Sequence, residues 1–164
     1  MGAPQEKTRP HIGKYEVLGT LGRGSMGVVY KARDPEIGRV VALKTLRTFS
    51  SGMEQDPDVA LERFRTEARS AGSLRHPNSI TIFEINQDSN PPFIVMDYVE
   101  GQSLESLLAK NGAIPPMAML YYMLQVASGL DFAHARGVIH RDIKPGNLHL
   151  DKHGRVYILD FGVA

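Results

Sequence analysis

The feature that most constrains the fold is a change of sequence pattern near residue 100. Before it, short runs rich in β-branched residues alternate with turn signals such as Asp34-Pro35, which is typical of antiparallel strands. After it, apolar residues recur at helical spacing between breakers such as Asn111-Gly112 and Pro115-Pro116. A β-rich half followed by a helical half predicts an α+β fold with segregated strands and helices.

The first half predicts five antiparallel strands and one helix. The helix begins at Asp56-Pro57, an N-cap followed by proline, and continues to about Leu74. In the second half, Ser103 caps a short helix over 104–110, and a longer helix follows Pro116 and ends near Ala135. The expected strands lie within 15–18, 28–30, 40–43, 80–85 and 93–99, with two more short ones at 148–150 and 156–159.

Composition excludes several classes of protein and partner. With 164 residues, 42% hydrophobic and 23% charged, the chain has an ordinary globular composition. Its net charge of +1 gives no field for nucleic acid or an anionic membrane, so neither partner is expected. The absence of cysteine fits a reducing cytoplasm, and residues 1–14 lack the apolar region of a signal peptide. We therefore expect a flexible leader over 1–14, cytoplasmic location and no membrane contact within this chain.

Gly22-Arg23-Gly24-Ser25-Met26-Gly27 matches a glycine pattern that occurs in nucleotide-binding loops but is weak alone. A dinucleotide fold needs a helix after these glycines, whereas Val28-Val29-Tyr30 favours a strand. A Walker loop is excluded because no Gly-Lys-Ser/Thr follows. The pattern thus predicts a hairpin whose backbone lies over phosphates, while an ordinary glycine-rich turn remains open here.

Lys44 ends the apolar run Val41-Ala42-Leu43, where a buried ammonium group is costly unless it is paired. Glu67 is its candidate partner, because it lies at the border of the apolar stripe of the expected helix over 56–74. A solvated position for Glu67 remains the alternative, since most carboxylates are exposed.

The most specific pattern lies near the end of the chain. His140-Arg141-Asp142-Ile143-Lys144-Pro145-Gly146-Asn147 is followed by Asp160-Phe161-Gly162. Together with the upstream motifs, in this order, the chain from about Tyr15 resembles a Ser/Thr protein kinase domain of the eukaryotic-like type found in bacteria. The resemblance implies a kinase-like fold: a five-stranded antiparallel N-lobe with one helix over 15–99, then the start of a helical C-lobe over 100–164.

The resemblance implies transfer of the γ-phosphoryl group of ATP to Ser or Thr hydroxyls of proteins. Asp142 would orient the substrate hydroxyl and accept its proton, and Lys144 would steady the transferring group. Lys44 would contact the α- and β-phosphates, and Glu67 would orient Lys44 through an ion pair. A lysine at position 144 marks Ser/Thr kinases over Tyr kinases.

The implied cofactor is Mg²⁺ or Mn²⁺, held by Asn147 and Asp160, with ATP as co-substrate. Residues Val29 and Ala42 would pack on adenine, and the backbone of residues 97 and 99 would meet its polar edge. The full set of implied ATP-binding residues is Leu21, Gly22, Arg23, Gly24, Ser25, Met26, Gly27, Val29, Ala42, Lys44, Met96, Asp97, Val99 and His149. His149 departs from the pattern, because an apolar residue usually lies under adenine at that position.

The kinase pattern continues past Gly162, but the sequence ends at Ala164. We therefore expect a fragment of a longer kinase, with an apolar face exposed on the helix over 117–135 and little transfer to proteins. The parent protein is expected to act on Ser/Thr proteins, with autophosphorylation, a kinase dimer or a membrane anchor outside this chain as further expectations. A catalytically inactive nucleotide-binding or regulatory module is the alternative, and a small-molecule kinase is disfavoured by Arg141 and Lys144.

Overall fold

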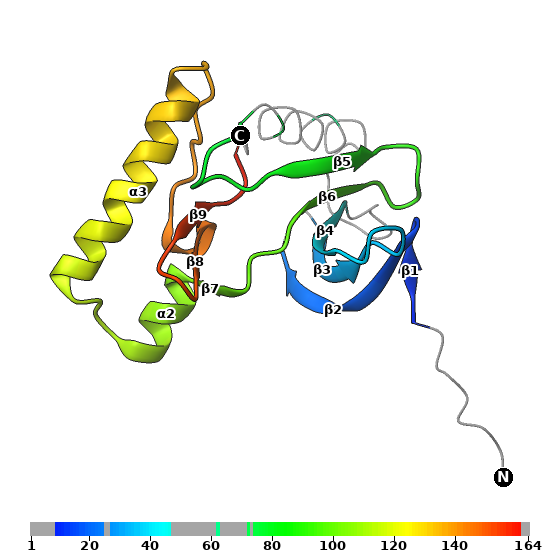
Figure 1. Ribbon diagram of the computed structural model, residues 1–164, viewed down its shortest axis with the longest axis horizontal. Helices are drawn as coiled ribbons and strands as arrows, with labels where there is room; N and C mark the ends of the chain where they lie inside the picture. Colours follow the sequence, from blue (N-terminus) through cyan, green and yellow to red (C-terminus); the bar gives the residue numbers. More distant parts are fainter. Residues whose placement is uncertain (1–8, 25–26, 47–61, 63–71, 73, 162–164) are drawn as a thin grey trace, which may run out of the picture.

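The computed structural model describes residues 9–24, 27–46, 62, 72 and 74–161 (Figure 1). Within these residues the strands form two sheets: a larger antiparallel sheet in the order β1-β2-β3-β4-β6-β5, and a smaller one in the order β7-β8-β9. The strands are β1 (His11–Ile12), β2 (Tyr15–Arg23), β3 (Gly27–Arg33), β4 (Val40–Leu46), β5 (Ile82–Asn86), β6 (Phe93–Asp97), β7 (Gly101–Ser103), β8 (Leu148–Asp151) and β9 (Val156–Ile158).

Alternation along the central strands gives the larger sheet two different faces. Val41 and Leu43 of β4 belong to a buried cluster with Tyr15, Phe93 and Val95. Their neighbours on β4, Ala42 and Lys44, line the opposite side, as do Ile94 and Met96 on the adjacent β6. The sheet therefore buries one face in its own core and offers the other to the helical part of the chain.

Strand β1 lies inside the segment 1–14, for which a flexible leader is expected from the sequence. Ile12 pairs with Tyr15 and packs against the cluster that contains Phe93. The turn between them needs Gly13, whose φ is +56° and whose absent Cβ would lie 2.9 Å from the Phe93 ring. Burial of Ile12 explains why the ordered sheet begins before Tyr15 and why it has six strands, not the expected five.

Two helices follow the smaller sheet's first strand, as expected from their capping residues. Helix α2 (Leu104–Asn111) begins at Ser103, whose Oγ accepts a hydrogen bond from the Ser106 N–H at 3.1 Å. It ends at Gly112, with φ +75° and an N–H that donates to Leu108 O. Helix α3 (Pro116–His134) has proline at its first position. The helix predicted over 56–74 falls almost entirely outside the described residues.

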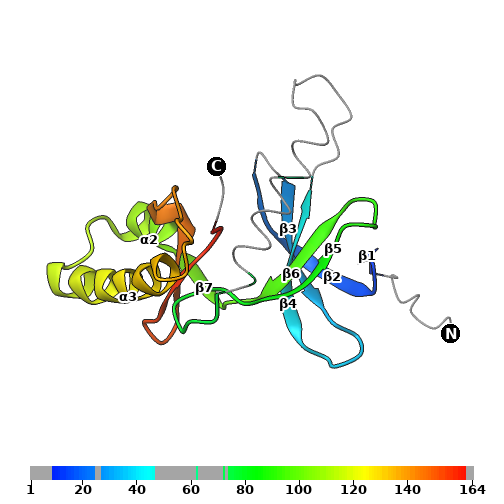
Figure 2. The same ribbon diagram turned by 90° about the horizontal axis from the view of Figure 1, so that it is seen from above.

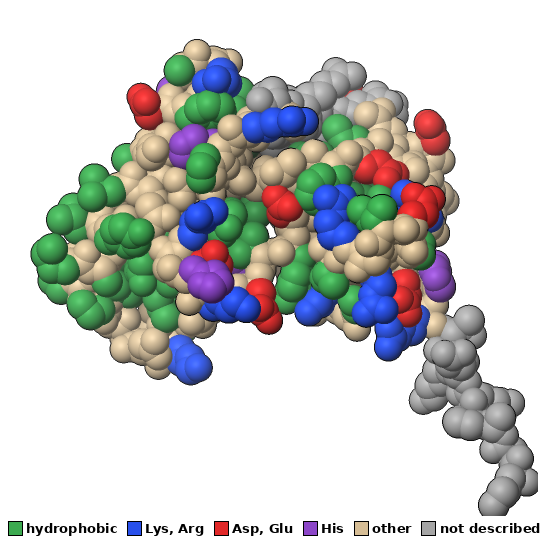
Figure 3. Space-filling model, in the orientation of Figure 1, with side chains coloured by type: hydrophobic (Ala, Val, Ile, Leu, Met, Phe, Trp, Pro, Cys, Tyr) green, Lys and Arg blue, Asp and Glu red, His purple; other side chains and the backbone are tan. Residues whose placement is uncertain are grey.

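Helix α3 buries one side and exposes the other. Val126 and Ala133 pack in a second core with residues of β8 and β9, including Ile158. The exposed side chains include Met117, Leu120, Tyr121 and Leu124, of which Met117 is 76% exposed, and hydrophobic side chains gather over α3 in Figure 3. The expected apolar face is thus present. Among the described helices, none has the length and apolar character needed to cross a membrane.

The two parts of the molecule meet along the path of β6 into β7. Figure 2 shows the larger sheet on one side, α2 and α3 on the other, and the chain crossing between them before β7. A short 3₁₀ turn, η1 (Pro145–Asn147), leads into β8, and the chain leaves β9 toward the gap between the two parts. This arrangement brings residues from both halves of the sequence to one cleft.

Candidate functional site

A cleft of about 500 Å³ lies between the larger sheet and the helical part. Its walls come from β2, β3, β4 and β6 on one side and from β7, α2, β8 and the segment after β9 on the other. Residues singled out from the sequence that line it are Leu21, Gly22, Val29, Ala42, Lys44, Met96, Asp97, Val99, His149 and Asp160. Residues far apart in the sequence therefore meet in one ligand-sized space.

For the other lining residues the sequence predicted no role at this site. They are Ile80, Tyr98, Gly101, Gln102, Ser103, Ser106, Gly146 and Leu159. Ile80, Tyr98 and Leu159 lie on short connecting segments, where neither periodicity nor spacing indicates which way a side chain points. Only Gly101 could have been noticed from its residue type, because a glycine within a strand often marks a place where another backbone approaches closely. An added Cβ there would lie 2.0 Å from Leu150 O.

The glycine pattern forms the end of the β2–β3 hairpin, as predicted. Gly22 pairs with Val29, and the Gly24 N–H donates to Gly27 O at 2.9 Å. A strand, not a helix, follows Gly27, which removes the dinucleotide fold as an alternative. Gly22 lies at the cleft, whereas Ser25 and Met26 fall outside the described residues.

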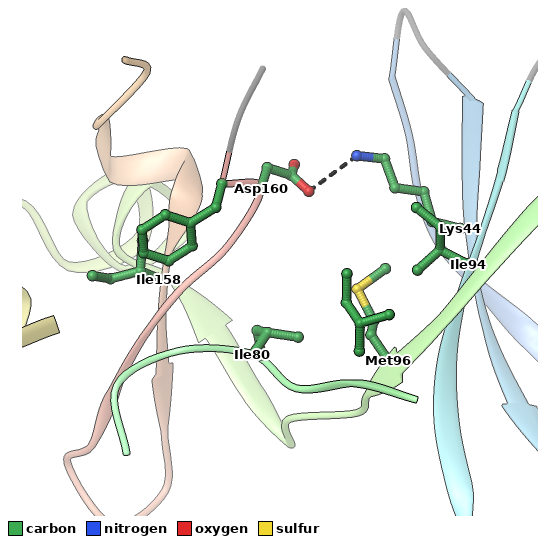
Figure 4. A pocket seen from close by; sticks show the side chains of 8 residues that line it. Lys44, Ile80, Ile94, Met96, Ile158 and Asp160 are labelled. Atoms are coloured by element: carbon green, nitrogen blue, oxygen red, sulfur yellow. Dashed lines mark hydrogen bonds and ion pairs between the residues drawn. The ribbon is translucent and has the colours of Figure 1, made fainter. Parts of the chain in front are cut away.

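Lys44 and Asp160 face each other across the cleft. Their Nζ and Oδ1 atoms are 3.0 Å apart, and the two side chains point toward one another from opposite sides in Figure 4. The Lys44 side chain is only 10% exposed, and that of Asp160 is 37% exposed. Asp160 has a φ of +56°, which is unusual for a residue other than glycine and typical of functional sites. The predicted partner of Lys44, Glu67, lies outside the described residues.

An apolar wall closes the space behind this ion pair. Ile80, Ile94, Met96 and Ile158 line a small cavity of about 20 Å³ beside Lys44 and Asp160 (Figure 4). Apolar surroundings exclude most water and strengthen the attraction between the two charges. Met96, on β6, lines both this cavity and the larger cleft, as do Lys44, Ile80 and Asp160.

The loop before η1 gathers three of the predicted catalytic and metal residues. Lys144 Nζ lies 2.7 Å from Asp142 Oδ2, and Asn147 Nδ2 donates to the same oxygen at 3.0 Å and to Asp142 O at 2.8 Å. The hydrogen bond from Lys144 is the main cause that lowers the pKa of Asp142; desolvation opposes it, and the hydrogen bond from Asn147 lowers the pKa further. Asp142 is therefore a carboxylate at neutral pH, able to accept but not to donate a hydrogen bond.

His140 joins this loop to the segment that carries Asp160. It is 1% exposed, its Nδ1 accepts the Asp142 N–H at 3.3 Å, and its Nε2 is 2.7 Å from Leu159 O. Because Nδ1 is the acceptor, Nε2 carries the proton and donates to Leu159 O. The ring also contacts Phe161, with centroids 4.9 Å apart. The sequence analysis assigned no role to His140. In the structure it is a buried residue that links the loop of Asp142 to the segment that carries Asp160.

The side chains of Asn147 and Asp160 fit a divalent metal ion bound together with phosphates. The Asn147 amide donates through Nδ2, so its Oδ1 is the atom that can ligate a cation. Among the described residues no group of three or more His, Cys, Asp or Glu side chains could hold a metal by itself. One carboxylate and one amide oxygen, completed by phosphate oxygens and water, is a donor set that suits Mg²⁺.

His149 lies on β8 at the edge of the cleft. Its Nε2 is buried and has no hydrogen-bond partner among the described residues. Burial lowers the pKa of His149, and hydrogen bonds to the backbone of Val99 and Gly101 partly oppose this effect. The imidazole is therefore neutral at pH 7 and presents an uncharged ring to the cleft.

We expect the folded chain to lose stability as the pH falls below about 6.5, the ordinary pKa of histidine. The unfolded chain binds a proton on His149 there, while burial resists protonation in the folded chain, so the loss grows until the lower folded-state pKa is passed. Thermal unfolding between pH 8 and pH 5 measures the effect. His149→Leu should show a smaller loss over the same range, and equal pH profiles for the two proteins would contradict the prediction.

Comparisons with known proteins identify the family. The family model for the protein kinase domain matches residues 15–164. The chain is 40% identical over 163 residues to a probable serine/threonine-protein kinase of Streptomyces coelicolor, covering 97% of this chain and 24% of that protein. It is also 40% identical to serine/threonine-protein kinase PrkC of Bacillus subtilis, covering 93% of this chain and 23% of that kinase. The chain thus spans about a quarter of the length of these relatives.

Solved structures confirm the fold. The Mycobacterium tuberculosis PknI kinase domain is similar with a TM-score of 0.76 and 32% identity over 96% of this chain and 63% of that one. PpkA-294 in its apo form has a TM-score of 0.85 at 22% identity, covering 95% of this chain and 61% of that one, which supports the fold alone. The cleft, the paired Lys44 and Asp160 and the family match over 15–164 together lead to one conclusion: this chain belongs to the protein kinase family.

Proposed function

We propose that this chain carries the ATP-binding and phosphoryl-transfer site of a serine/threonine protein kinase. The observation that carries the proposal is the 3.0 Å contact between Lys44 and Asp160 across a cleft lined by the other predicted nucleotide-binding residues. A buried cation opposite an acidic metal ligand is an arrangement suited to a bound nucleoside triphosphate and its metal ion. Protein kinases use ATP and a divalent metal ion, and we infer that the metal is Mg²⁺.

The cleft offers separate surfaces to the parts of ATP. Val29, Ala42 and Met96 supply apolar contacts for adenine, and the backbone between residues 97 and 99 supplies donors and acceptors for its polar edge. The hairpin at Gly22 brings backbone close to the phosphates, and Lys44 places its ammonium group beside them. The metal ion, held by Asp160 and Asn147, would neutralise phosphate charge.

The exposed loop that carries Asp142 and Lys144 suits the acceptor hydroxyl. Asp142 stays ionised because Lys144 and Asn147 hold its pKa low, so it can accept the hydrogen bond of a Ser or Thr hydroxyl and orient it. Lys144, 2.7 Å from Asp142, supplies positive charge where negative charge develops on the transferring group. The presence of Lys44, Asp142, Asn147 and Asp160 together disfavours an inactive regulatory module.

Nucleotide-dependent thermal unfolding tests the proposal. ATP with Mg²⁺ at a hundredfold excess over its Kd should stabilise the purified chain by about 2.7 kcal/mol, and Lys44→Met should remove this gain. Lys110→Met is the matched control, because Lys110 lies in the last turn of α2 and is exposed. A melting temperature of the unmodified chain that does not change when ATP and Mg²⁺ are added would overturn the proposed function.

Phosphate transfer tests the class of acceptor. With radiolabelled ATP and a protein rich in Ser, Thr and Tyr, the small amount of label transferred should be found on Ser or Thr and not on Tyr, and Asp142→Asn should abolish it. Label confined to Tyr would contradict the Ser/Thr assignment.

A further inference from the structure

The outer edge of β9 is held by hydrogen bonds with Asn78 and Gln125 instead of by another named strand. In the described part of the chain, β9 pairs with β8 on one side and is the last strand of its sheet. On the other side, the Val156 N–H donates to Gln125 Oε1 at 3.0 Å, and Val156 O accepts from Asn78 Nδ2 at 2.8 Å. Further along, the Ile158 N–H donates to Asn78 O at 2.9 Å. Two residues, Asn78 and Gln125, thus form hydrogen bonds with the backbone N–H and C=O groups of Val156 and with the N–H group of Ile158.

Gln125 uses both ends of its amide in this contact. Its Oε1 accepts from Asn78 Nδ2 at 3.0 Å as well as from Val156, and its Nε2 donates to Gly154 O at 2.9 Å. Gln125 is on α3, one turn before Gly129, where an added Cβ would lie 2.8 Å from Ile158 Cδ1. The glycine lets α3 approach β9 closely enough for the amide of Gln125 to reach its edge.

Asn78 connects the same place to the larger sheet. It is 8% exposed and lies in the loop that precedes β5, next to Ser79, whose backbone forms a parallel bridge with Ile158. Two residues after Asn78, Ile80 lines the cleft. The side chain of Asn78 is therefore bound to α3 and β9, while its own chain continues into the sheet that carries Lys44.

Beyond β9, the chain passes directly to Asp160. Leu159 is held on both sides, since its N–H donates to Asn147 O at 2.9 Å and its carbonyl accepts from His140 Nε2. Gln125 and Asn78 hold the strand at its start and at Ile158, only two residues before Asp160. Neither Asn78 nor Gln125 is among the described residues that line the cleft.

We propose that Asn78 and Gln125 are positioning residues that set Asp160 opposite Lys44, acting through the outer edge of β9. The inference deepens the proposed function, on which it rests, because Asp160 is assigned there to the metal ion. If the pair only stabilised the fold, its loss would lower the melting temperature without changing how strongly Mg²⁺ improves ATP binding. If it positions Asp160, that improvement must fall.

The test compares substitutions of Gln125 that keep its size. Gln125→Met removes the acceptor for Asn78 and Val156, whereas Gln125→Glu keeps an acceptor for both and replaces the group that donates to Gly154 O with a carboxylate oxygen. Asp151→Ala is the matched control, because it removes two hydrogen bonds, from the N–H groups of His153 and Arg155, within the turn of the same hairpin but not at the outer edge of β9. The binding of ATP to each purified chain is measured with and without Mg²⁺.

We expect Gln125→Met to reduce the Mg²⁺-dependent gain in ATP affinity by about fivefold or more, with Mg²⁺-free affinity unchanged. Gln125→Glu should retain most of the gain, and Asp151→Ala all of it. An unchanged gain in Gln125→Met, at whatever melting temperature, would overturn the inference, as would an equal loss in Asp151→Ala.

Hydrogen exchange separates this inference from the proposed function, because it needs no nucleotide. Gln125→Met should accelerate exchange of the Leu159 amide, which is bonded to Asn147 and not to Gln125. Unchanged protection of Leu159 would reject the positioning role. If the unmodified chain does not bind ATP but Gln125→Met still accelerates exchange of the Leu159 amide, the proposed function is rejected. The positioning role of Asn78 and Gln125 through β9 is then still supported.

Discussion

The Asp160→Asn variant is expected to fold and to lose about a hundredfold of the ATP affinity that Mg²⁺ provides. An amide in place of the carboxylate keeps an oxygen donor but removes the negative charge that a hard cation prefers. Folding should survive, because asparagine keeps a side-chain oxygen that can accept a hydrogen bond from the Lys44 ammonium group, and the side chain at position 160 is 37% exposed. Calorimetric titration with ATP, with and without Mg²⁺, gives both affinities from the same protein.

Asp131→Asn is the control for the loss of one carboxylate, since Asp131 is exposed on α3 and away from the cleft. It should bind ATP as the unmodified chain does, with and without Mg²⁺. If Asp160→Asn kept the full Mg²⁺-dependent gain in ATP affinity, Asp160 would not be a metal ligand. The proposal that Asn78 and Gln125 position Asp160 for the metal ion would then also fail.

Gly101→Ala is expected to destabilise the chain by about 3 kcal/mol or more. The new Cβ would lie 2.0 Å from Leu150 O and 3.0 Å from Asp151 Cα, and both are backbone atoms that no rotamer change can move. The clash can be relieved only if strands β7 and β8, in which Gly101 pairs with Asp151, move apart. A loss of this size lowers the melting temperature of a chain of this length by about 10 °C.

Gly19→Ala provides the comparison, because no heavy atom lies within 4 Å of the position its Cβ would take. Its melting temperature should stay close to that of the unmodified chain. Similar melting temperatures for Gly101→Ala and Gly19→Ala would mean that β7 and β8 are further apart in solution than in the structure.

Local patterns predicted much of the fold because their causes are local. The Ser103 cap, the glycine that ends α2 and the hairpin after Gly22 each depend on residues within a few positions. Strand β1 escaped prediction, because its two residues have no pattern of their own and are held by burial of Ile12 against distant Phe93. The resemblance to kinases, carried by residues 140–147 and 160–162, predicted the fold that the family match and the solved structures confirm.

The contacts around the site were harder to predict, because they join residues remote in sequence. Asn78 is part of a sequence that reads only as a helix breaker, and Gln125 lies among apolar residues of α3 with no motif. Their roles emerge only when the fold brings β9 between them. Likewise, His149 was noticed as a departure from the pattern, but its buried Nε2 without a partner depends on neighbours that spacing cannot reveal.

The contact between Asn78 and Val156 also bears on the order in which the chain folds during synthesis. The two residues are 78 positions apart, and at about 5–20 residues per second the ribosome needs about 4–16 seconds to pass from one to the other. All strands of the larger sheet end before residue 98, so this sheet can complete its pairing while Asn78 still lacks its partner strand. The cleft therefore cannot form before β9 has been synthesised, and a nucleotide that touches both walls stabilises the state in which the two parts are joined.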